Sequence, residues 1–209
     1  MKYLNITCFS LLFAGIMSAQ ETPRFAFNIG GGFTQPVGAT ARQLDDHGWN
    51  VQAGAGVNFS QYVGLMLQLD YNRLGINTGT LNSVGFPGGD VNVFSATLDP
   101  IVHLTPRGHF DIYLIGGGGV YHRTQEFTQP GIAGVTAYDP FFGFYTAAVP
   151  TTEVVASYSV NKPGVNGGAG IALGTKWHGK IFAEARYHRI FMSNYAHTDY
   201  IPVSFGFRW

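Results

Sequence analysis

Charged side chains are scarce in this sequence. Asp, Glu, Lys and Arg make up 11% of its 209 residues, against about 25% in an average soluble domain. The 12 basic and 12 acidic residues balance, so the chain has no excess of positive charge with which to bind a nucleic acid. At this length we expect a single folded domain.

Long apolar runs and cysteines are also missing from most of the chain. After residue 20 no apolar run approaches the ~20 residues that a transmembrane helix needs, so we exclude such helices there. The one cysteine, Cys8, lies among the first 20 residues. The rest of the chain therefore forms no disulfide, which suits a fold held together by a closed ladder of backbone hydrogen bonds.

The first residues are typical of a secretory signal peptide. Lys2 precedes an apolar run at about 8–17, and the small residues Ser18 and Ala19 follow it. We expect cleavage after Ala19, which gives a signal peptide of residues 1–19 and one mature domain of residues 20–209. A retained membrane anchor is the alternative, but the apolar run is shorter than a membrane span requires.

The final stretch, 201–209, has the clearest pattern. Val203, Phe205, Phe207 and Trp209 alternate with small or polar residues, which predicts a strand with one apolar face. The closing strand of an outer-membrane barrel has this pattern, because it presents alternate apolar residues to lipid and an aromatic residue at the membrane edge.

Seven other stretches alternate in the same way. They cover approximately residues 24–34, 49–59, 63–72, 91–104, 110–122, 165–175 and 181–188. The connections are long and short in turn, as in outer-membrane barrels, whose strands need about 9–11 residues to cross. We therefore predict an all-β fold, an eight-stranded antiparallel up-and-down transmembrane barrel with short periplasmic turns and longer external loops.

The main structural alternative is a soluble lipocalin-like barrel, which would turn the apolar face inward and leave the polar face in water. The aromatic residues favour the membrane barrel, because Tyr and Trp gather at both membrane interfaces. We expect an external belt of Trp49, Tyr71, Tyr121 and Tyr187, and a periplasmic belt of Phe59, Trp177 and Trp209.

Four segments carry a resemblance to a known family. They are F-N-I-G-G-G-F-T-Q-P-V-G (27–38), L-Q-L-D-Y-N-R-L-G (67–75), E-A-R-Y-H-R-I (184–190) and Y-I-P-V-S-F-G-F-R-W (200–209). With them the chain resembles the small eight-stranded outer-membrane barrels, the group of the OmpX and OmpA transmembrane barrels and the opacity adhesins. The group shares no reaction and no cofactor.

The resemblance implies a monomeric integral protein of the outer membrane of a Gram-negative-type bacterium, exported through the periplasm. Its surroundings would be outer-membrane lipid and lipopolysaccharide. The resemblance also implies insertion by the barrel-assembly machinery through the C-terminal strand, at Val203, Phe205, Phe207 and Trp209.

The inward faces of the predicted strands carry charges of both signs. They are Arg24, Asp70, Asp99, Asp111, Glu184, Arg186 and Arg208. An eight-stranded barrel is only wide enough for its side chains to fill, so we expect these charges to pair as a network that plugs the lumen. Asp99 and Asp111 flank one tight turn, and we expect them to lie close together with Arg186 or Arg208 between them. A proton or ion path is the alternative.

The glycine runs at 30–32 and 116–119 are followed by no predicted helix, so they do not match a phosphate-binding loop. We expect them to permit tight curvature and to leave room for large side chains on neighbouring strands. His103 and His109 bracket a turn, but histidines at the polar end of a barrel wall do not by themselves indicate a metal site. We predict no metal and no cofactor.

An enzyme that modifies lipid A is a further alternative. His188, Ser193 and Glu184 resemble in kind the His, Ser and Glu of the lipid A deacylase barrels. In that family the His and Ser stand two residues apart on one face of a strand, whereas Ile190 occupies that position here. Because His188 is also predicted to face the lumen rather than lipid, we predict that the protein is not an enzyme.

The longest predicted loop, 123–161, contains a cluster of aromatic residues. They are Tyr138, Phe141, Phe142, Phe144 and Tyr145. Three interpretations stay open. The cluster forms an exposed surface for a partner, a host molecule or lipid headgroups, it folds over the barrel mouth as a lid, or part of the segment extends the fifth and sixth strands above the membrane.

The sequence thus favours an integral outer-membrane barrel with a side-chain-filled lumen and a structural or surface-interaction role through its external loops. A narrow pore or transporter for small or hydrophobic molecules, like the OmpW-type barrels, is the alternative. A lipid-modifying outer-membrane enzyme is the third hypothesis.

Overall fold

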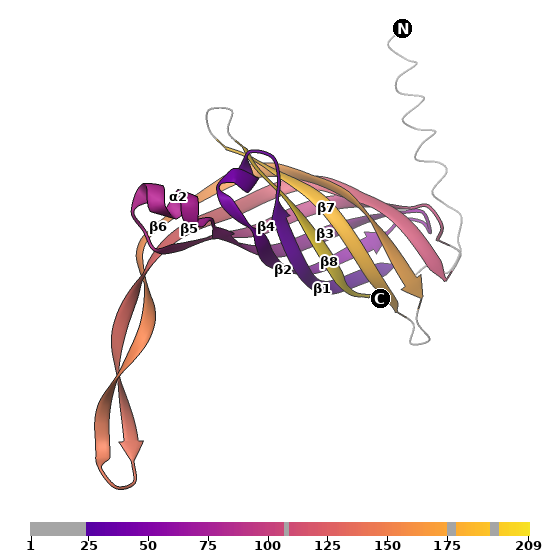
Figure 1. Ribbon diagram of the computed structural model, residues 1–209. Coiled ribbons are helices and arrows are strands. Elements are labelled where there is room, and N and C mark those ends of the chain that lie inside the picture. The colour runs from indigo at the N-terminus through magenta and orange to yellow at the C-terminus, as the bar shows by residue number, and fades with distance from the viewer. Residues whose placement is uncertain (1–23, 107–108, 175–178, 193–196) are drawn as a thin grey trace.

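Eight antiparallel strands pair in chain order and close into a barrel, as predicted (Figure 1). The computed structural model describes residues 24–106, 109–174, 179–192 and 197–209, so the predicted signal peptide, 1–19, lies outside the described residues. The strands are β1 (Phe25–Pro36), β2 (Leu44–Asn58), β3 (Val63–Ile76), β4 (Gly88–His103), β5 (Phe110–Asp139), β6 (Gly143–Gly174), β7 (Lys180–Phe191) and β8 (His197–Arg208). A 3-10 helix, η1 (Thr40–Arg42), follows β1, and a helix, α2 (Thr78–Val84), follows β3.

β8 closes the barrel against β1. Ile29 lies opposite Phe207, and Phe33 lies opposite Val203. Past the end of this ladder, the backbones of Phe27 and Trp209 exchange two hydrogen bonds, at 2.8 and 3.0 Å. Closure gives each strand of the wall a neighbour on both sides, which pairs its backbone polar groups as a membrane-spanning sheet requires.

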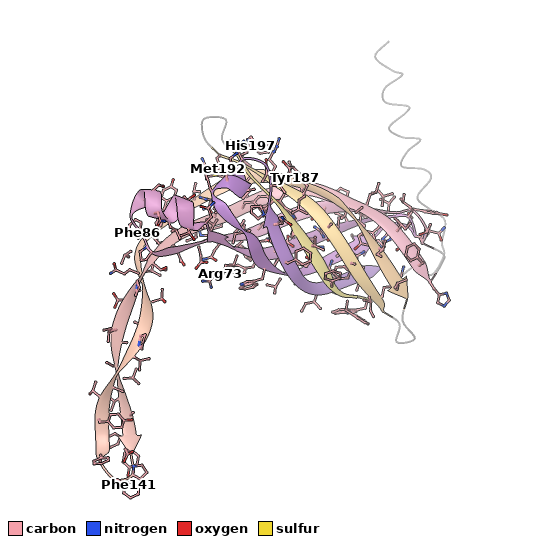
Figure 2. The ribbon with its side chains drawn as sticks, in the orientation of Figure 1. Arg73, Phe86, Phe141, Tyr187, Met192 and His197 are labelled. Carbon is pink, nitrogen blue, oxygen red and sulfur yellow. The ribbon has the colours of Figure 1, made fainter. Side chains whose placement is uncertain are left out.

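The wall is apolar outside and polar inside, as the alternation predicts. Phe27 and Ile29 point outward and are exposed, whereas Asn28 between them is buried in the lumen. β8 repeats the pattern, with Phe205 exposed and Ser204 buried, and Figure 2 shows side chains standing outward along the wall. This arrangement is the reverse of a soluble barrel, so the lipocalin-like alternative is wrong.

Aromatic residues lie on the outer surface at both ends of the wall. Trp49 and Tyr71 contact each other near one end, with ring centroids 5.4 Å apart. Phe59 and Trp209 are exposed at the other end. Trp177 lies outside the described residues. These positions agree with the predicted belts. The exception is Tyr121, which is described below.

Inward-facing glycines let strands and large side chains approach one another. A Cβ on Gly168 would collide with the Ala185 carbonyl oxygen of the adjacent strand, and a Cβ on Gly170 would collide with the Tyr113 ring. By contrast, a Cβ on the outward-facing Gly167 would meet nothing within 4 Å. Within the predicted glycine runs, a Cβ on Gly30 would come within 3.0 Å of the Phe182 ring and one on Gly119 would collide with the Ala96 carbonyl oxygen. These glycines therefore leave room for neighbouring strands and large side chains, as the sequence predicts.

The segment predicted as a loop after β3 contains the helix α2. Asn77 begins it by accepting a hydrogen bond from the Thr80 amide, and Gly85 ends it in a left-handed conformation with φ +77°, a backbone region that glycine favours. No helix in the described part of the chain has the length and hydropathy needed to cross a membrane. The barrel end that carries α2 and the longer connections is called the long-loop end here, and the opposite end is the short-turn end.

β5 and β6 continue beyond the barrel as a two-stranded hairpin. The prediction of an irregular segment at 123–161 is wrong, because its two halves pair from Arg123 opposite Val160 to Asp139 opposite Gly143. One register shift interrupts the ladder, between Phe127 and Thr128. In Figure 1 the hairpin leaves the barrel beside α2 and turns away from the wall. The segment therefore extends the two strands and is not a lid.

Candidate functional site

Arg186 on β7 is the centre of a buried hydrogen-bond network in the lumen. Its guanidinium donates to Asp99 on β4 at 2.8 Å and to Glu184 on its own strand at 2.5 Å. Asp99 also accepts hydrogen bonds from Asn166 on β6 and from Thr97, both at 2.9 Å. All five side chains are buried, so the network ties three strands together through the middle of the barrel.

β3 joins this network through two side chains. With its amide oxygen turned toward Arg186, Gln68 accepts a hydrogen bond from the guanidinium at 2.7 Å. Asp70 accepts one from Ser95 on β4 at 3.4 Å. The predicted luminal positions of Asp70, Asp99, Glu184 and Arg186 are therefore those that the structure shows.

A second network links the strands on either side of the β1–β8 closure. Asn50 on β2 donates to Thr34 on β1 at 3.2 Å, and Thr34 donates to Asn72 on β3 at 2.7 Å. Ser204 on β8 donates to Asn50 at 2.7 Å. All four side chains are buried, and these bonds satisfy much of their hydrogen-bonding capacity, although the Asn72 amide nitrogen has no partner among the described residues.

Arg208 also lies in the lumen, as predicted. Its Nη2 is 3.6 Å from Glu184 Oε2, and its guanidinium lies over the Tyr113 ring, 4.4 Å from the centroid. Arg24 is the exception among the predicted luminal charges. It is exposed, and it precedes β1 at the short-turn end, so the prediction that it belongs to the network is wrong.

The expected sharing of one cation between Asp99 and Asp111 is also wrong. Asp111 pairs instead with His103 at 2.6 Å and with Lys180 at 3.2 Å. Leu98 lies opposite Gly118, so Asp99 lies opposite Gly117. Gly117 is six residues from Asp111 along β5. At about 3.3 Å per residue this separates the two carboxylates by roughly 20 Å, and each has its own cations.

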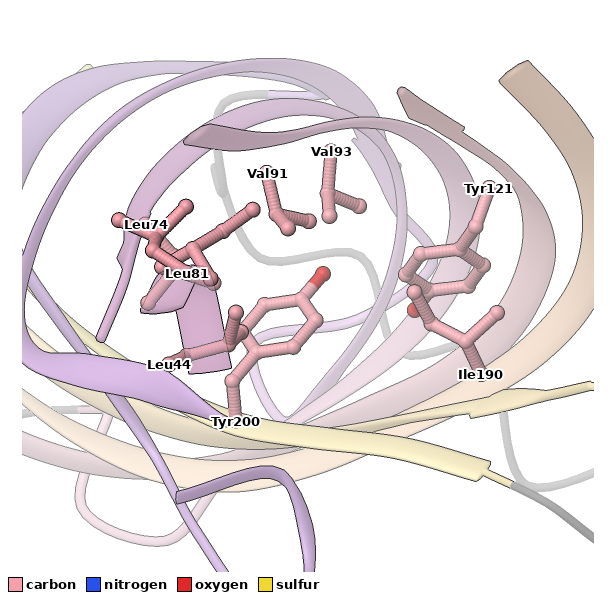
Figure 3. Close-up of a cluster of buried hydrophobic side chains, with 9 residues drawn as sticks. Leu44, Leu74, Leu81, Val91, Val93, Tyr121, Ile190 and Tyr200 are labelled. Atoms are coloured by element: carbon pink, nitrogen blue, oxygen red, sulfur yellow. The ribbon is translucent and has the colours of Figure 1, made fainter. Parts of the chain in front are cut away.

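An apolar cluster fills the lumen at the long-loop end (Figure 3). Its buried members are Leu44, Leu74, Ile76, Leu81, Val91, Val93, Tyr121, Ile190 and Tyr200. Leu81 comes from α2, so the helix contributes to this cluster. Tyr121 was expected in the outward aromatic belt, and that expectation is wrong, because its position has the same inward parity as Tyr113.

A second apolar cluster lies toward the short-turn end. Its members are Ala26, Met66, Ile101, Tyr113, Ile115, Ala172 and Phe182. Between the two clusters, Gln68, Ser95 and Asp99 have no exposed surface. The polar networks therefore lie between two apolar clusters.

His188 is buried at the boundary between the polar network and the long-loop cluster. Its ring stacks on Tyr200 with centroids 5.1 Å apart, and its Nδ1 is hydrogen-bonded to the Tyr121 hydroxyl at 3.1 Å. Ser193 lies outside the described residues. A His facing the closed lumen cannot act on a lipid at the outer surface, which argues against the lipid A deacylase arrangement.

The described residues contain no group of three or more His, Cys, Asp or Glu side chains arranged to hold a metal ion. His103 is hydrogen-bonded to Asp111. The arrangement at the short-turn end is therefore a polar cluster around Asp111, in which His103 makes a hydrogen bond and Lys180, a residue outside the predicted strand, supplies a cation.

Ion pairs also lie at the long-loop end, beyond the apolar belt, one of them on the outer surface and the other with a buried carboxylate. Arg73 pairs with Asp90 at 2.6 Å, and Arg189 makes hydrogen bonds of 2.9 and 3.0 Å with Asp199. Partial burial raises the pKa of Asp199, but hydrogen bonds from Arg189 and Tyr187 lower it more, so the carboxyl titrates below its usual range. These pairs mark where the wall changes from apolar to polar.

The aromatic cluster of the predicted external loop lies at the tip of the hairpin. Phe141, Phe142 and Phe144 are 91%, 87% and 78% exposed, and Tyr138 and Tyr145 beside them are exposed as well. Figure 2 shows Phe141 at the end of the hairpin that is farthest from the barrel. The structure thus brings the five predicted residues together, and it holds them away from the barrel mouth.

Solved structures of membrane barrels match this arrangement. Neisserial surface protein A matches with a TM-score of 0.55 and 13% identity, over 88% of this chain and 95% of that protein. The chain has the fold of the small eight-stranded outer-membrane barrels. A major outer membrane protein from Thermus thermophilus matches this barrel with a TM-score of 0.51 and 10% identity, over 88% of this chain and 97% of that protein.

At these identities the matches establish the fold and leave the function open. No protein-family model and no curated protein matches the barrel in sequence. The fold implied by the resemblance to the small outer-membrane barrels is confirmed.

The apolar layers inside the barrel are the main feature that the sequence analysis missed. Leu74 and Ile76 continue the inward parity of Asp70 and Asn72 along β3. They could have been found in the sequence by following the same alternation beyond residue 72, where the predicted strand ends.

Proposed function

We propose that the protein is an integral outer-membrane barrel that displays the β5–β6 hairpin at the cell surface and contacts a partner through its tip. The observation that carries this proposal is the hairpin itself, whose aromatic tip is highly exposed and whose ladder is continuous with the wall. A rigid scaffold that holds an exposed recognition element is a common way for a small barrel to acquire function.

The closed lumen supports a structural role for the barrel rather than transport. Its charges pair with one another, and apolar clusters lie on both sides of them. In this proposal the long-loop end faces outside, the short-turn end faces the periplasm, and the strand ending at Trp209 serves for insertion by the barrel-assembly machinery.

Protease treatment of intact cells tests the display of the hairpin. The stretch 124–161 contains no Lys or Arg but has aromatic residues at its tip. We therefore expect chymotrypsin to cut the protein near Phe141 on intact cells and trypsin to leave the hairpin uncut. The measurement is the size of the fragments on a denaturing gel. Cleavage by chymotrypsin only after the cells are lysed would contradict external display.

Conductance distinguishes the closed barrel from the pore alternative. We expect the refolded protein to show no steady single-channel conductance in a planar bilayer, because apolar side chains fill the lumen on both sides of its charges. A heat-dependent shift on a gel confirms that the protein in the bilayer is folded. Reproducible unit conductance from folded protein would instead support a narrow pore or transporter.

A further inference from the structure

The hairpin tip combines the strongest apolar exposure of the described chain with a backbone whose polar groups are paired. Asp139 Oδ1 accepts hydrogen bonds from the amides of Phe141 and Phe142, at 2.8 and 3.1 Å. Asp139 also pairs across the hairpin with Gly143, which has a φ of +77°. Because the turn satisfies these amides internally, the tip can enter an apolar phase without leaving them unpaired.

The aromatic residues are ordered along the tip by polarity. Phe141 and Phe142 occupy the apex, and the pair of Asp139 and Gly143 lies next to it. Tyr138, opposite Phe144, and then Tyr145, opposite Ala137, follow farther along the ladder. Tyr138 contacts Phe144, with ring centroids 5.1 Å apart. Tyrosines prefer the headgroup level of a bilayer, where their hydroxyl groups stay hydrated, whereas phenylalanine has no polar group to hydrate. The two tyrosine hydroxyl groups therefore belong to residues farther from the apex than Phe141 and Phe142, while the Asp139 carboxyl near the apex is engaged with the turn amides.

The lack of basic residues on the hairpin limits the kinds of partner that it can bind. Between Arg123 and Lys162 there is no basic residue, and the acidic residues are Glu126, Asp139 and Glu153. A surface without cations has no means of neutralising phosphate-rich or sulfated polymers, or an anionic membrane. A neutral, zwitterionic lipid surface can be bound without cations on the protein.

The ribbon that carries the tip makes no apolar core of its own. Ile132, Val149 and Val154 are exposed, and a two-stranded hairpin is marginally stable alone in water. In Figure 1 the ribbon leaves the long-loop end and runs to the side, crosswise to the length of the barrel, so its direction does not distinguish the protein's own membrane from a second surface. The choice rests on charge, because a hairpin without basic residues cannot neutralise the anionic lipopolysaccharide expected around its own barrel, whereas a neutral bilayer needs no cations.

We propose that the tip inserts into the boundary between headgroups and acyl chains of a neutral phospholipid bilayer that faces the outer surface. This inference rests on the proposed external display of the hairpin and names its partner. Phe141 and Phe142 enter the boundary, Tyr138 and Tyr145 stay at the headgroup level, and the barrel anchors the protein in its own membrane. Amphipathic elements that bind in this way reach about 5–10 Å into the boundary.

Capture of vesicles by the full-length protein in nanodiscs tests the inference. The probe is a phosphatidylcholine vesicle whose acyl chains carry bromine, which quenches tryptophan, while the nanodisc lipids are unbrominated. We expect the vesicles to carry the protein upward in a flotation gradient. In a Phe142→Trp variant, the introduced tryptophan adds its emission to that of the native tryptophans. When vesicles are added, this added emission should shift to shorter wavelength and be quenched.

Two double variants separate the tip from the ribbon. Phe141→Ser with Phe142→Ser should lower vesicle capture roughly tenfold or more. Val149→Ser with Val154→Ser changes exposed apolar residues away from the apex, and it should alter capture by less than about twofold if insertion depends on the tip. Both variants should keep the heat-dependent gel shift of the barrel.

Three results would overturn the inference. The first is an absence of capture by folded protein whose hairpin chymotrypsin still cuts. The second is a blue-shifted signal from the introduced tryptophan before vesicles are added, which means insertion into the protein's own nanodisc. The third is pairing of nanodiscs with one another without vesicles, which makes a second copy the partner. Failure of the external display itself is seen separately, as resistance to chymotrypsin on intact cells.

Discussion

Replacing Arg186 with Met is expected to lower the free energy of unfolding by about 3–5 kcal/mol. The guanidinium donates to Asp99 and to Glu184, and all three groups are buried. Removal of the cation leaves two carboxylates near each other in a medium of low dielectric constant without their partner. The loss comes from those abandoned charges rather than from the missing attraction alone.

Reversible urea unfolding of the protein in lipid vesicles measures this effect. Arg73→Met is the matched control, because Arg73 makes an ion pair with Asp90 on the outer surface, and exposed pairs contribute about 0–1 kcal/mol. A double variant that also carries Asp99→Asn should recover part of the stability, because it removes one unpaired carboxylate while Glu184 keeps its ion pair with Arg208. Similar losses in Arg186→Met and Arg73→Met would contradict a central role for Arg186.

Replacing Tyr200 with Ala is expected to lower the free energy of unfolding by about 3–5 kcal/mol. The side chain is fully buried in the long-loop cluster, and its ring stacks on His188. Its removal opens a cavity in the long-loop cluster, because the ring points from β8 into the lumen, as Figure 3 shows. The strands around it cannot collapse into the space, because their backbone ladder holds them apart.

Tyr200→Phe is the control for this prediction. The Tyr200 hydroxyl has no hydrogen-bond partner among the described residues, so its removal should be neutral or slightly stabilising. Unfolding of both variants in lipid vesicles gives the comparison. A large loss in Tyr200→Phe would mean that the hydroxyl, and not the ring, holds this end of the lumen together.

The buried interior and the exposed hairpin have different roles in this protein. Charges at the centre of the lumen link strands that are not neighbours in the wall, and apolar clusters lie on both sides of them. Among the longer connections, α2 contributes Leu81 to the long-loop cluster, whereas no residue between Thr128 and Val154 belongs to either buried cluster. The β5–β6 ribbon is therefore free to carry an exposed apolar tip, and changes there should leave the barrel intact.

The hairpin shows where the sequence pattern fails. A period of two reveals a strand when one face is in a different environment from the other. Beyond the membrane both faces of the ribbon are in water, so the residues between Phe127 and Val154 have no reason to alternate. The helix α2 was missed because about two turns contain too few residues for a helical period to be recognised.

The sequence by itself determined the closed eight-stranded barrel and which residues face lipid, because lipid outside and a narrow lumen inside impose a strict alternation on each strand. Only the tertiary structure decided the partners within the lumen. Asn166 reaches Asp99 across β5 at Gly117, where a Cβ would collide with Asp99. The alternation of one strand carries no information about which residues of non-neighbouring strands meet, since that depends on the stagger and closure of all eight.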